Sequence, residues 1–266
     1  MARLREVFAR AANEKRAALI IYMCAGDPDL ATTGRLLDAA AEAGADVIEI
    51  GMPFSDPTAD GPVIQRASER ALRSDTTLKG LLDCVRAFRA RKPHTGIVLF
   101  GYYNPLLAFD EQEIAKAATQ TEVDGFLIVD LPPEEGGSMR EALAQNGLDF
   151  VPLIAPTTQG DRVQSIARSA GAFLYYVSLT GVTGAEADLG AAAKRAVAIR
   201  RQSDLPVAVG FGVKTADDAR SLALAGVDGV VVGSAVCSAI EHAADADAAV
   251  QQVAELVRAL RAACQR

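Results

Sequence analysis

A short junction recurs along this chain where a helical pattern gives way to an apolar run. Its copies are Ala43-Gly44-Ala45-Asp46-Val47, Val123-Asp124-Gly125-Phe126, Ala170-Gly171-Ala172-Phe173 and Ala225-Gly226-Val227-Asp228-Gly229-Val230. Glycine or a turn at such a point is typical of a helix end, and the apolar run after it is typical of a buried strand. Helices followed by strands, repeated along the chain, predict a mainly parallel sheet.

The apolar runs predict eight strands. They are Ala18–Met23, Asp46–Gly51, Gly96–Tyr102, Gly125–Asp130, Asp149–Ala155, Phe173–Ser178, Pro206–Gly210 and Gly229–Gly233. Helical patterns follow them, over Ala31–Ala43, Val63–Arg73, Leu78–Arg91, Glu111–Gln120, Glu134–Gln145, Asp161–Ser169, Ala191–Arg201, Ala216–Ala225 and Ala246–Ala263. Eight such units in about 250 residues are typical of a (β/α)8 TIM barrel. An open doubly wound sheet is the alternative, but Ala25-Gly26-Asp27-Pro28 lacks the GxGxxG motif that usually follows its first strand.

A further helix is predicted in front of the first strand. Apolar residues recur at helical spacing over Ala2–Ala12, which predicts an amphipathic helix that covers the amino-terminal mouth of the barrel. The sequence contains no linker or low-complexity segment. We therefore expect residues 1–266 to form a single α/β domain, a TIM barrel with an extra N-terminal helix.

Composition excludes several classes of function. The net charge of −7 and the pI near 5.0 argue against a nucleic-acid surface, which needs a basic face. The four cysteines form no CxxC pair or zinc-like cluster, so we expect reduced thiols, a cytoplasmic location and no metal site. The apolar segment Ala17–Gly26 is too short for a membrane span and does not resemble an export signal.

The stretch Val47–Ala67 carries two carboxylates that stand out from the regular pattern. Glu49 lies inside an apolar strand, where an ionised carboxylate would lose its hydration. Asp60 lies in the loop that follows, just before a helical pattern begins near Val63. In a barrel both would lie at the carboxyl ends of the strands, where barrel enzymes carry their active sites.

Other strand ends predict a binding pocket beside these carboxylates. Aromatic residues expected at this mouth are Tyr22, Phe100, Tyr102, Tyr175 and Phe211. Glycines follow the last two strands, in Gly210-Phe211-Gly212 and Gly233-Ser234, where many barrels bind a phosphate through backbone amides. Ser234 is also expected to cap the helix Ala235–Ile240. The residues thus indicate a metal-free enzyme that binds a phosphorylated molecule with an apolar moiety.

Each of these residues also has a structural explanation. A buried Glu49 could be paired with a lysine or arginine, although the neighbouring strands show no basic residue at matching depth. Asp60 lies in an ordinary turn sequence, and barrel cores also use aromatic residues. The two histidines, His94 and His242, are expected at the surface.

The chain resembles the tryptophan synthase alpha chain family. The segment Glu49–Pro62, EIGMPFSDPTADGP, matches the signature of that family almost position for position. Further matching segments run the length of the chain: Ala25–Pro28, Tyr102–Pro105, Asp130–Glu135, Leu153–Thr158, Gly181–Gly184, Gly210–Gly212 and Gly233–Ala235.

The resemblance implies a lyase of tryptophan biosynthesis that cleaves indole-3-glycerol phosphate into indole and glyceraldehyde 3-phosphate. It implies that Glu49 is the acid–base residue and that Asp60 accepts a hydrogen bond from the ring nitrogen. Tyr102 would orient an active-site carboxylate. The remaining implied contacts are Gly184, Gly212, Gly233 and Ser234 for the phosphate, and Tyr22, Phe100, Tyr175 and Phe211 around the substrate. Thr183 would lie on a lid, Gly181–Gly190, that closes over the site.

The resemblance also implies a partner. Family members work with a beta chain in an alpha2beta2 complex, and that beta chain, not this chain, carries pyridoxal phosphate. Loops around Pro53–Asp56 and Asn104–Phe109 would face it. Three other functions stay open: a stand-alone indole-releasing lyase, a catalytically weak subunit that activates a partner, and another phosphate-sugar barrel enzyme such as an isomerase.

Overall fold

The computed structural model describes residues 2–177, 188–210 and 212–266. The strands in these ranges are β1 (Ala18–Cys24), β2 (Val47–Gly51), β3 (Gly96–Gly101), β4 (Gly125–Ile128), β5 (Asp149–Phe150), β6 (Leu153–Ile154), β7 (Leu174–Val177), β8 (Val207–Gly210) and β9 (Gly229–Val232). The helices are α1 (Ala2–Asn13), α2 (Leu30–Ala43), α3 (Pro62–Arg73), α4 (Leu78–Arg89), α5 (Tyr103–Phe109), α6 (Glu111–Gln120), α7 (Gly137–Gln145), α8 (Asp161–Ser169), α9 (Leu189–Ser203), α10 (Ala216–Leu224), α11 (Ser234–Glu241) and α12 (Ala246–Ala263).

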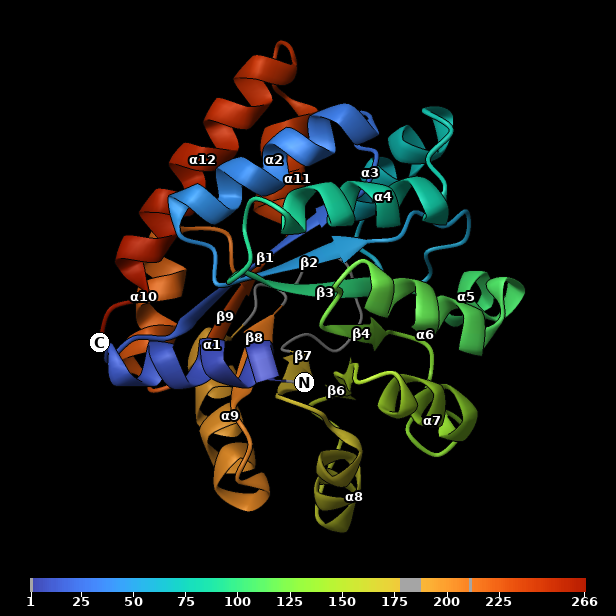
Figure 1. Cartoon of the computed structure of the whole chain (residues 1–266). Coiled ribbons are helices and arrows are strands. Elements are labelled where there is room, and N and C mark those ends of the chain that lie inside the picture. Colours follow the sequence, from blue (N-terminus) through green and yellow to red (C-terminus); the bar gives the residue numbers. More distant parts are fainter. Residues whose placement is uncertain (1, 178–187, 211) are drawn as a thin grey trace.

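The strands form one curled parallel sheet with helices around its outside (Figure 1). Their order is β5-β4-β3-β2-β1-β9-β8-β7-β6. Every described pairing between two of these strands is parallel, as expected for strands joined by helical crossovers. The predicted TIM-barrel architecture is therefore confirmed.

The predicted strand Asp149–Ala155 is divided into β5 and β6. Pro152 lies between them and has no N–H to donate to a neighbouring strand. The amide of Val151 still donates to the carbonyl of Phe126 at 2.8 Å, and the amide of Tyr175 donates to the carbonyl of Pro152 at 3.1 Å. This interrupted strand thus bridges β4 and β7 and closes the barrel, so the eightfold plan is kept.

Two predictions around the third strand were wrong. The strand ends at Gly101 rather than Tyr102, and Tyr102 is the N-cap residue of α5. The segment Asn104–Phe109, expected to be a loop, instead lies within the helix α5 (Tyr103–Phe109). The helix predicted over Glu134–Gln145 begins only at Gly137.

The recurring junction tells why the strands lie in register. Its aspartates accept hydrogen bonds from backbone amides of the preceding barrel strand: Asp46 from Leu19 at 2.9 Å, Asp124 from Ile97 at 2.8 Å, and Asp228 from Val207 at 3.0 Å. Each aspartate also pairs with an arginine, namely Arg16, Arg89 and Arg200 respectively. These contacts lie where the strands begin, opposite the candidate site.

The interior of the barrel is a second apolar cluster, separate from the larger one between strands and helices. Helix α1 contributes Leu4, Val7, Phe8 and Ala11 to it. The rings of Phe8 and Phe173 lie 4.9 Å apart. As predicted, α1 covers the mouth at which the strands begin (Figure 1).

Candidate active site

Glu49 is buried in β2 without compensation. Its side chain is 0% exposed, and neither carboxylate oxygen has a hydrogen-bond partner within residues 2–177, 188–210 and 212–266. Burial raises the pKa of Glu49 to about 8, because an ionised carboxylate loses its hydration there. Near neutral pH the carboxyl is mostly protonated but can still ionise, which suits a group that both gives and takes a proton.

Tyr22 and Phe100 lie on the strands that flank Glu49. Tyr22 is the register partner of Glu49, and Phe100 is that of Gly51. Their rings meet edge to face with centroids 5.0 Å apart. The Tyr22 ring lies over Gly51: a Cβ atom built on Gly51 would lie 2.3 Å from the Tyr22 hydroxyl. Glycine at the end of β2 thus makes room for the aromatic wall beside Glu49.

Asp60 is held by Tyr102. The Tyr102 hydroxyl accepts a hydrogen bond from the amide of Ala59 at 2.9 Å and donates to Asp60 Oδ2 at 3.1 Å. The side-chain amide of Gln65 donates to the Asp60 carbonyl at 2.9 Å. Burial raises the pKa of Asp60 to about 6, and the Tyr102 hydrogen bond opposes this rise. Asp60 therefore remains mainly ionised at neutral pH, although its pKa is higher than that of a free aspartate.

Tyr175 lies close enough to both Glu49 and Asp60 to be affected by the charge of each. Burial, followed by the charges of Glu49 and Asp60, raises the pKa of Tyr175 well above its usual value. Burial also raises the pKa of Tyr22 well above its usual value, and nearby charges that include Asp60 and Glu49 act in the same direction. A Cβ atom on Gly210 would lie 2.0 Å from the Tyr175 hydroxyl, so β8 also needs glycine at its end. The structure thus places both predicted carboxylates and four of the five predicted aromatic residues, Tyr22, Phe100, Tyr102 and Tyr175, at the mouth where the barrel strands end.

Gly210, the last residue of β8, and Gly233, which follows β9, lie at the ends of two paired strands. Gly212 has a φ of +90°, a conformation that favours glycine. Gly233 is the N-cap residue of α11, and a Cβ atom on it would lie 3.2 Å from the Tyr22 ring. The expectation that Ser234 caps this helix was wrong: Ser234 is its first residue, and no side-chain capping bond forms. The backbone amides at this helix start are the donors an anion needs.

Other predicted residues lie outside the part of the chain that is described. They are Thr183, Gly184 and Phe211, together with residues 181–187 of the expected lid. Both histidines are exposed. Within the described ranges, no group of three or more His, Cys, Asp or Glu side chains is placed to hold a metal ion. Over the same ranges, no helix is long and apolar enough to cross a membrane.

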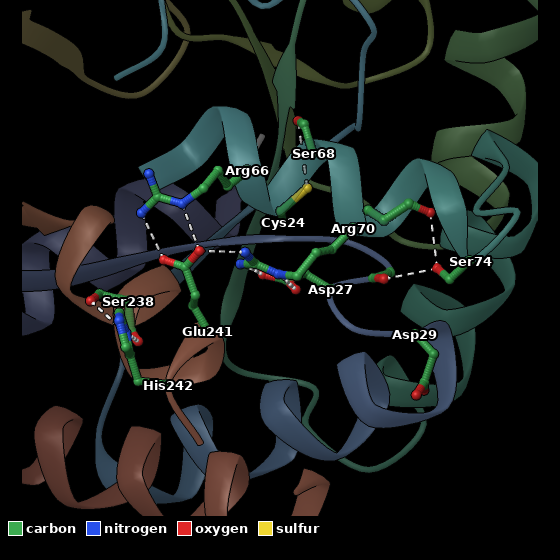
Figure 2. A network of polar contacts seen from close by, with 12 residues as sticks. Cys24, Asp27, Asp29, Arg66, Ser68, Arg70, Ser74, Ser238, Glu241 and His242 are labelled. Atoms are coloured by element: carbon green, nitrogen blue, oxygen red, sulfur yellow. Dashed lines mark hydrogen bonds and ion pairs between the residues drawn. The ribbon is translucent and has the colours of Figure 1, made fainter. Parts of the chain in front are cut away.

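An ion-pair network beside the site was not predicted. Arg66 and Arg70 of α3 reach Glu241 of α11, and Arg70 also reaches Asp27 in the loop after β1 (Figure 2). The available signal was the spacing of the two arginines, four residues apart on one helix, which places them on one face. Their acidic partners lie far away in sequence, so spacing alone does not identify them.

Comparison with known proteins gives a consistent result. The sequence model of one family, described as tryptophan synthase alpha chain, matches residues 8–265. The tryptophan synthase alpha chain of Geobacter sulfurreducens is 47% identical over 264 residues, which are 99% of each chain. That of Burkholderia thailandensis is 46% identical over 264 residues, covering 99% of this chain and 97% of the relative.

Solved structures agree. Tryptophan synthase subunit alpha from Legionella pneumophila has a TM-score of 0.90 and 37% identity, covering 98% of both chains. A chain of Mycobacterium tuberculosis tryptophan synthase has a TM-score of 0.90 and 32% identity, covering 99% of this chain and 98% of that one.

Proposed function

Because the chain belongs to the tryptophan synthase alpha chain family, which cleaves indole-3-glycerol phosphate to indole and glyceraldehyde 3-phosphate, we propose that Glu49 and Asp60 perform this cleavage here. The chain is a carbon–carbon lyase of tryptophan biosynthesis. The observation that supports the residue assignment is the burial of Glu49 at the carboxyl end of β2, where its carboxyl has no hydrogen-bond partner among the described residues.

Glu49 moves a proton twice in this proposal. In its protonated form it donates to the indole ring carbon that bears the side chain, which leaves a positive charge on the ring nitrogen. The resulting carboxylate then takes the proton of the hydroxyl next to that carbon. As the carbon–carbon bond breaks, its electrons return to the ring, the hydroxyl carbon becomes the aldehyde, and Glu49 is again protonated. A pKa of about 8 supports both steps.

Asp60 stabilises the charge that appears between these steps. Its carboxylate accepts a hydrogen bond from the ring N–H, and Tyr102 holds that carboxylate through a 3.1 Å hydrogen bond. A preorganised anion close to a developing positive charge lowers the barrier because no solvent has to reorganise. The pKa of about 6 supports an ionised Asp60 at neutral pH.

The remaining contacts divide between the two ends of the substrate. Backbone amides hold the phosphate, helped by the N-terminal dipole of α11. The residues proposed for this end are Gly184, Gly212, Gly233 and Ser234. The residues proposed around the indole and glycerol are Tyr22, Phe100, Tyr175, Phe211 and the lid residue Thr183.

The partner is the tryptophan synthase beta chain, in line with the match to tryptophan synthase alpha chains and to a chain of M. tuberculosis tryptophan synthase. Alpha chains of this family do not themselves bind pyridoxal phosphate, which is held by the beta chain. We propose that this chain uses no cofactor, acts as one domain over residues 1–266, and forms an alpha2beta2 complex in the cytoplasm. The four free cysteines support the location. Leu107 and Phe109 of α5 are 54% and 40% exposed, which supports this surface as part of the beta-chain contact.

Indole release by the purified chain, measured before and after addition of a beta chain, tests the proposal. We expect slow release that the beta chain accelerates. Glu49→Gln should fold normally and lose cleavage by roughly 10²–10⁴-fold. Wild-type turnover in this variant would refute the role of Glu49. Fast release without a partner would instead indicate a stand-alone lyase, and activation of the beta chain without any cleavage would indicate a catalytically weak subunit.

A further inference from the structure

One guanidinium joins three segments that lead into the candidate active site (Figure 2). Arg70, in the third turn of α3, donates from Nε to Asp27 Oδ1 at 2.7 Å and from Nη2 to Asp27 Oδ2 at 2.9 Å. Its remaining nitrogen, Nη1, donates to Glu241 Oε1 at 2.8 Å. Because arginine is a rigid, planar donor, these three bonds fix both carboxylates relative to α3.

Each segment in this network carries part of the site. Asp27 lies in the loop after β1, the strand that bears Tyr22. Helix α3 begins two residues after Asp60. Glu241 is the last residue of α11, and the first residue of that helix, Ser234, is at the proposed phosphate site. At about 1.5 Å per residue, the phosphate end of α11 lies only about 10 Å from Glu241 along a rigid helix.

The two ion pairs of Arg70, with Asp27 and with Glu241, differ in how much the fold depends on them. Asp27 is 0% exposed; its burial raises its pKa and the Arg70 hydrogen bond lowers it, so loss of Arg70 would leave a buried carboxylate without a counter-ion. The Glu241 side chain is 17% exposed and also binds Arg66, at 2.6 and 2.8 Å. Hydrogen bonds from Arg66 and the nearby Arg70 lower the pKa of Glu241 to about 2, so it is ionised throughout the working range. A substitution of Glu241 therefore removes its ion pair with Arg70 while the buried Asp27 keeps its ion pair with the same arginine.

We propose that Glu241 and Arg70 are positioning residues for the cleavage reaction, holding the phosphate-binding end of α11 at a fixed place relative to Asp60. The inference rests on the proposed role of Gly233 and Ser234 at the phosphate. If α11 shifts, the phosphate and the indole ring of one substrate molecule can no longer occupy their sites at the same time. The affinity for the phosphorylated substrate should then fall. Binding of indole alone does not depend on the position of α11.

Glu241→Ala in the full chain tests this inference. We expect the KM for indole-3-glycerol phosphate to rise about tenfold, with kcat within about twofold of wild type. Binding of glycerol 3-phosphate should weaken by a similar factor, while the affinity for indole stays unchanged. Glu241→Gln, which keeps one acceptor oxygen, should give a smaller change in the same direction.

Glu42→Ala is the matched control. Glu42 pairs with Lys92 at 2.8 Å, which is also an ion pair between a helix and a distant segment, but away from the site. It should leave KM and glycerol 3-phosphate binding unchanged. An unchanged KM in Glu241→Ala, or an equal weakening of indole and glycerol 3-phosphate binding, would overturn the positioning role. If the wild-type chain bound glycerol 3-phosphate but released no indole, the proposed function would fail while the positioning role could still be read from binding.

Discussion

The burial of Glu49 should make the wild-type protein less stable than a variant that cannot ionise there. The native pKa is about 8, whereas a glutamate in an unfolded chain titrates near 4.5. Between these values the unfolded chain releases a proton that the native chain retains, so rising pH favours unfolding. This group therefore contributes no penalty below about pH 4.5, and its full penalty is reached above about pH 8.

Glu49→Gln removes this penalty while it keeps the shape of the side chain. One pKa unit corresponds to about 1.4 kcal/mol, so the pH-dependent gain in the free energy of unfolding is about 1 kcal/mol near pH 5. It grows to about 3 kcal/mol near pH 7 and to about 5 kcal/mol near pH 8.5. The inactive variant should thus be the more stable protein, which is the expected trade-off between catalytic activity and stability.

Urea denaturation of both proteins, followed by circular dichroism at these three pH values, measures the difference. Glu6→Gln, a change at an exposed carboxyl of α1, is the control and should alter the free energy of unfolding by less than about 0.5 kcal/mol at every pH. A Glu49→Gln difference that stays constant from about pH 5 to about pH 8.5 would refute the argument that Glu49 is neutral in the native barrel.

Three further predictions follow from the site and the barrel base. Tyr102→Phe removes a hydrogen bond that favours ionised Asp60, so the acidic limb of the pH profile of kcat/KM should move to higher pH. An acidic limb at the wild-type pH would show that this hydrogen bond does not affect the reaction. Asp124→Ala leaves the buried Arg89 without its counter-ion and should lower the free energy of unfolding by roughly 3–5 kcal/mol in urea titrations; a loss below about 1 kcal/mol would contradict this. Gly51→Ala should displace the Tyr22 ring and lower kcat/KM about tenfold, with partial recovery when Tyr22→Phe is added; equal activity of Gly51→Ala and wild type would show that the ring can move freely.

Much of the barrel follows from local pattern, and the exceptions have local causes. Helix α12 has the predicted bounds because Asp245 caps it and its apolar face is regular. Pro152 was visible inside the predicted fifth strand, and its missing N–H is the reason that the strand divides there. Helix α5 was missed because it is short and leaves Leu107 and Phe109 exposed, so it lacks the amphipathic period that identifies a helix in sequence.

The candidate site likewise has features that local sequence reveals and contacts that it does not. A carboxylate inside an apolar strand is a strong sequence signal, and Glu49 was found by it. The hydrogen bond from Tyr102 to Asp60 spans 42 residues, and that from Arg70 to Glu241 spans 171. Such contacts depend on which helices become neighbours once the sheet curls. Spacing within one segment carries no information about that.

The junction aspartates have a consequence for how the barrel can be divided. They join neighbouring strands in pairs, β1 with β2, β3 with β4, and β8 with β9. A break in the chain after the exposed Gln159 leaves all three pairs within one fragment or the other, whereas a break within α6 separates Asp124 from Ile97. Two fragments produced at Gln159 should therefore reassemble into an active barrel more readily than two produced within α6. We therefore expect the tolerance of this barrel to chain breaks and circular permutation to depend on these aspartate-linked strand pairs rather than on the number of strands.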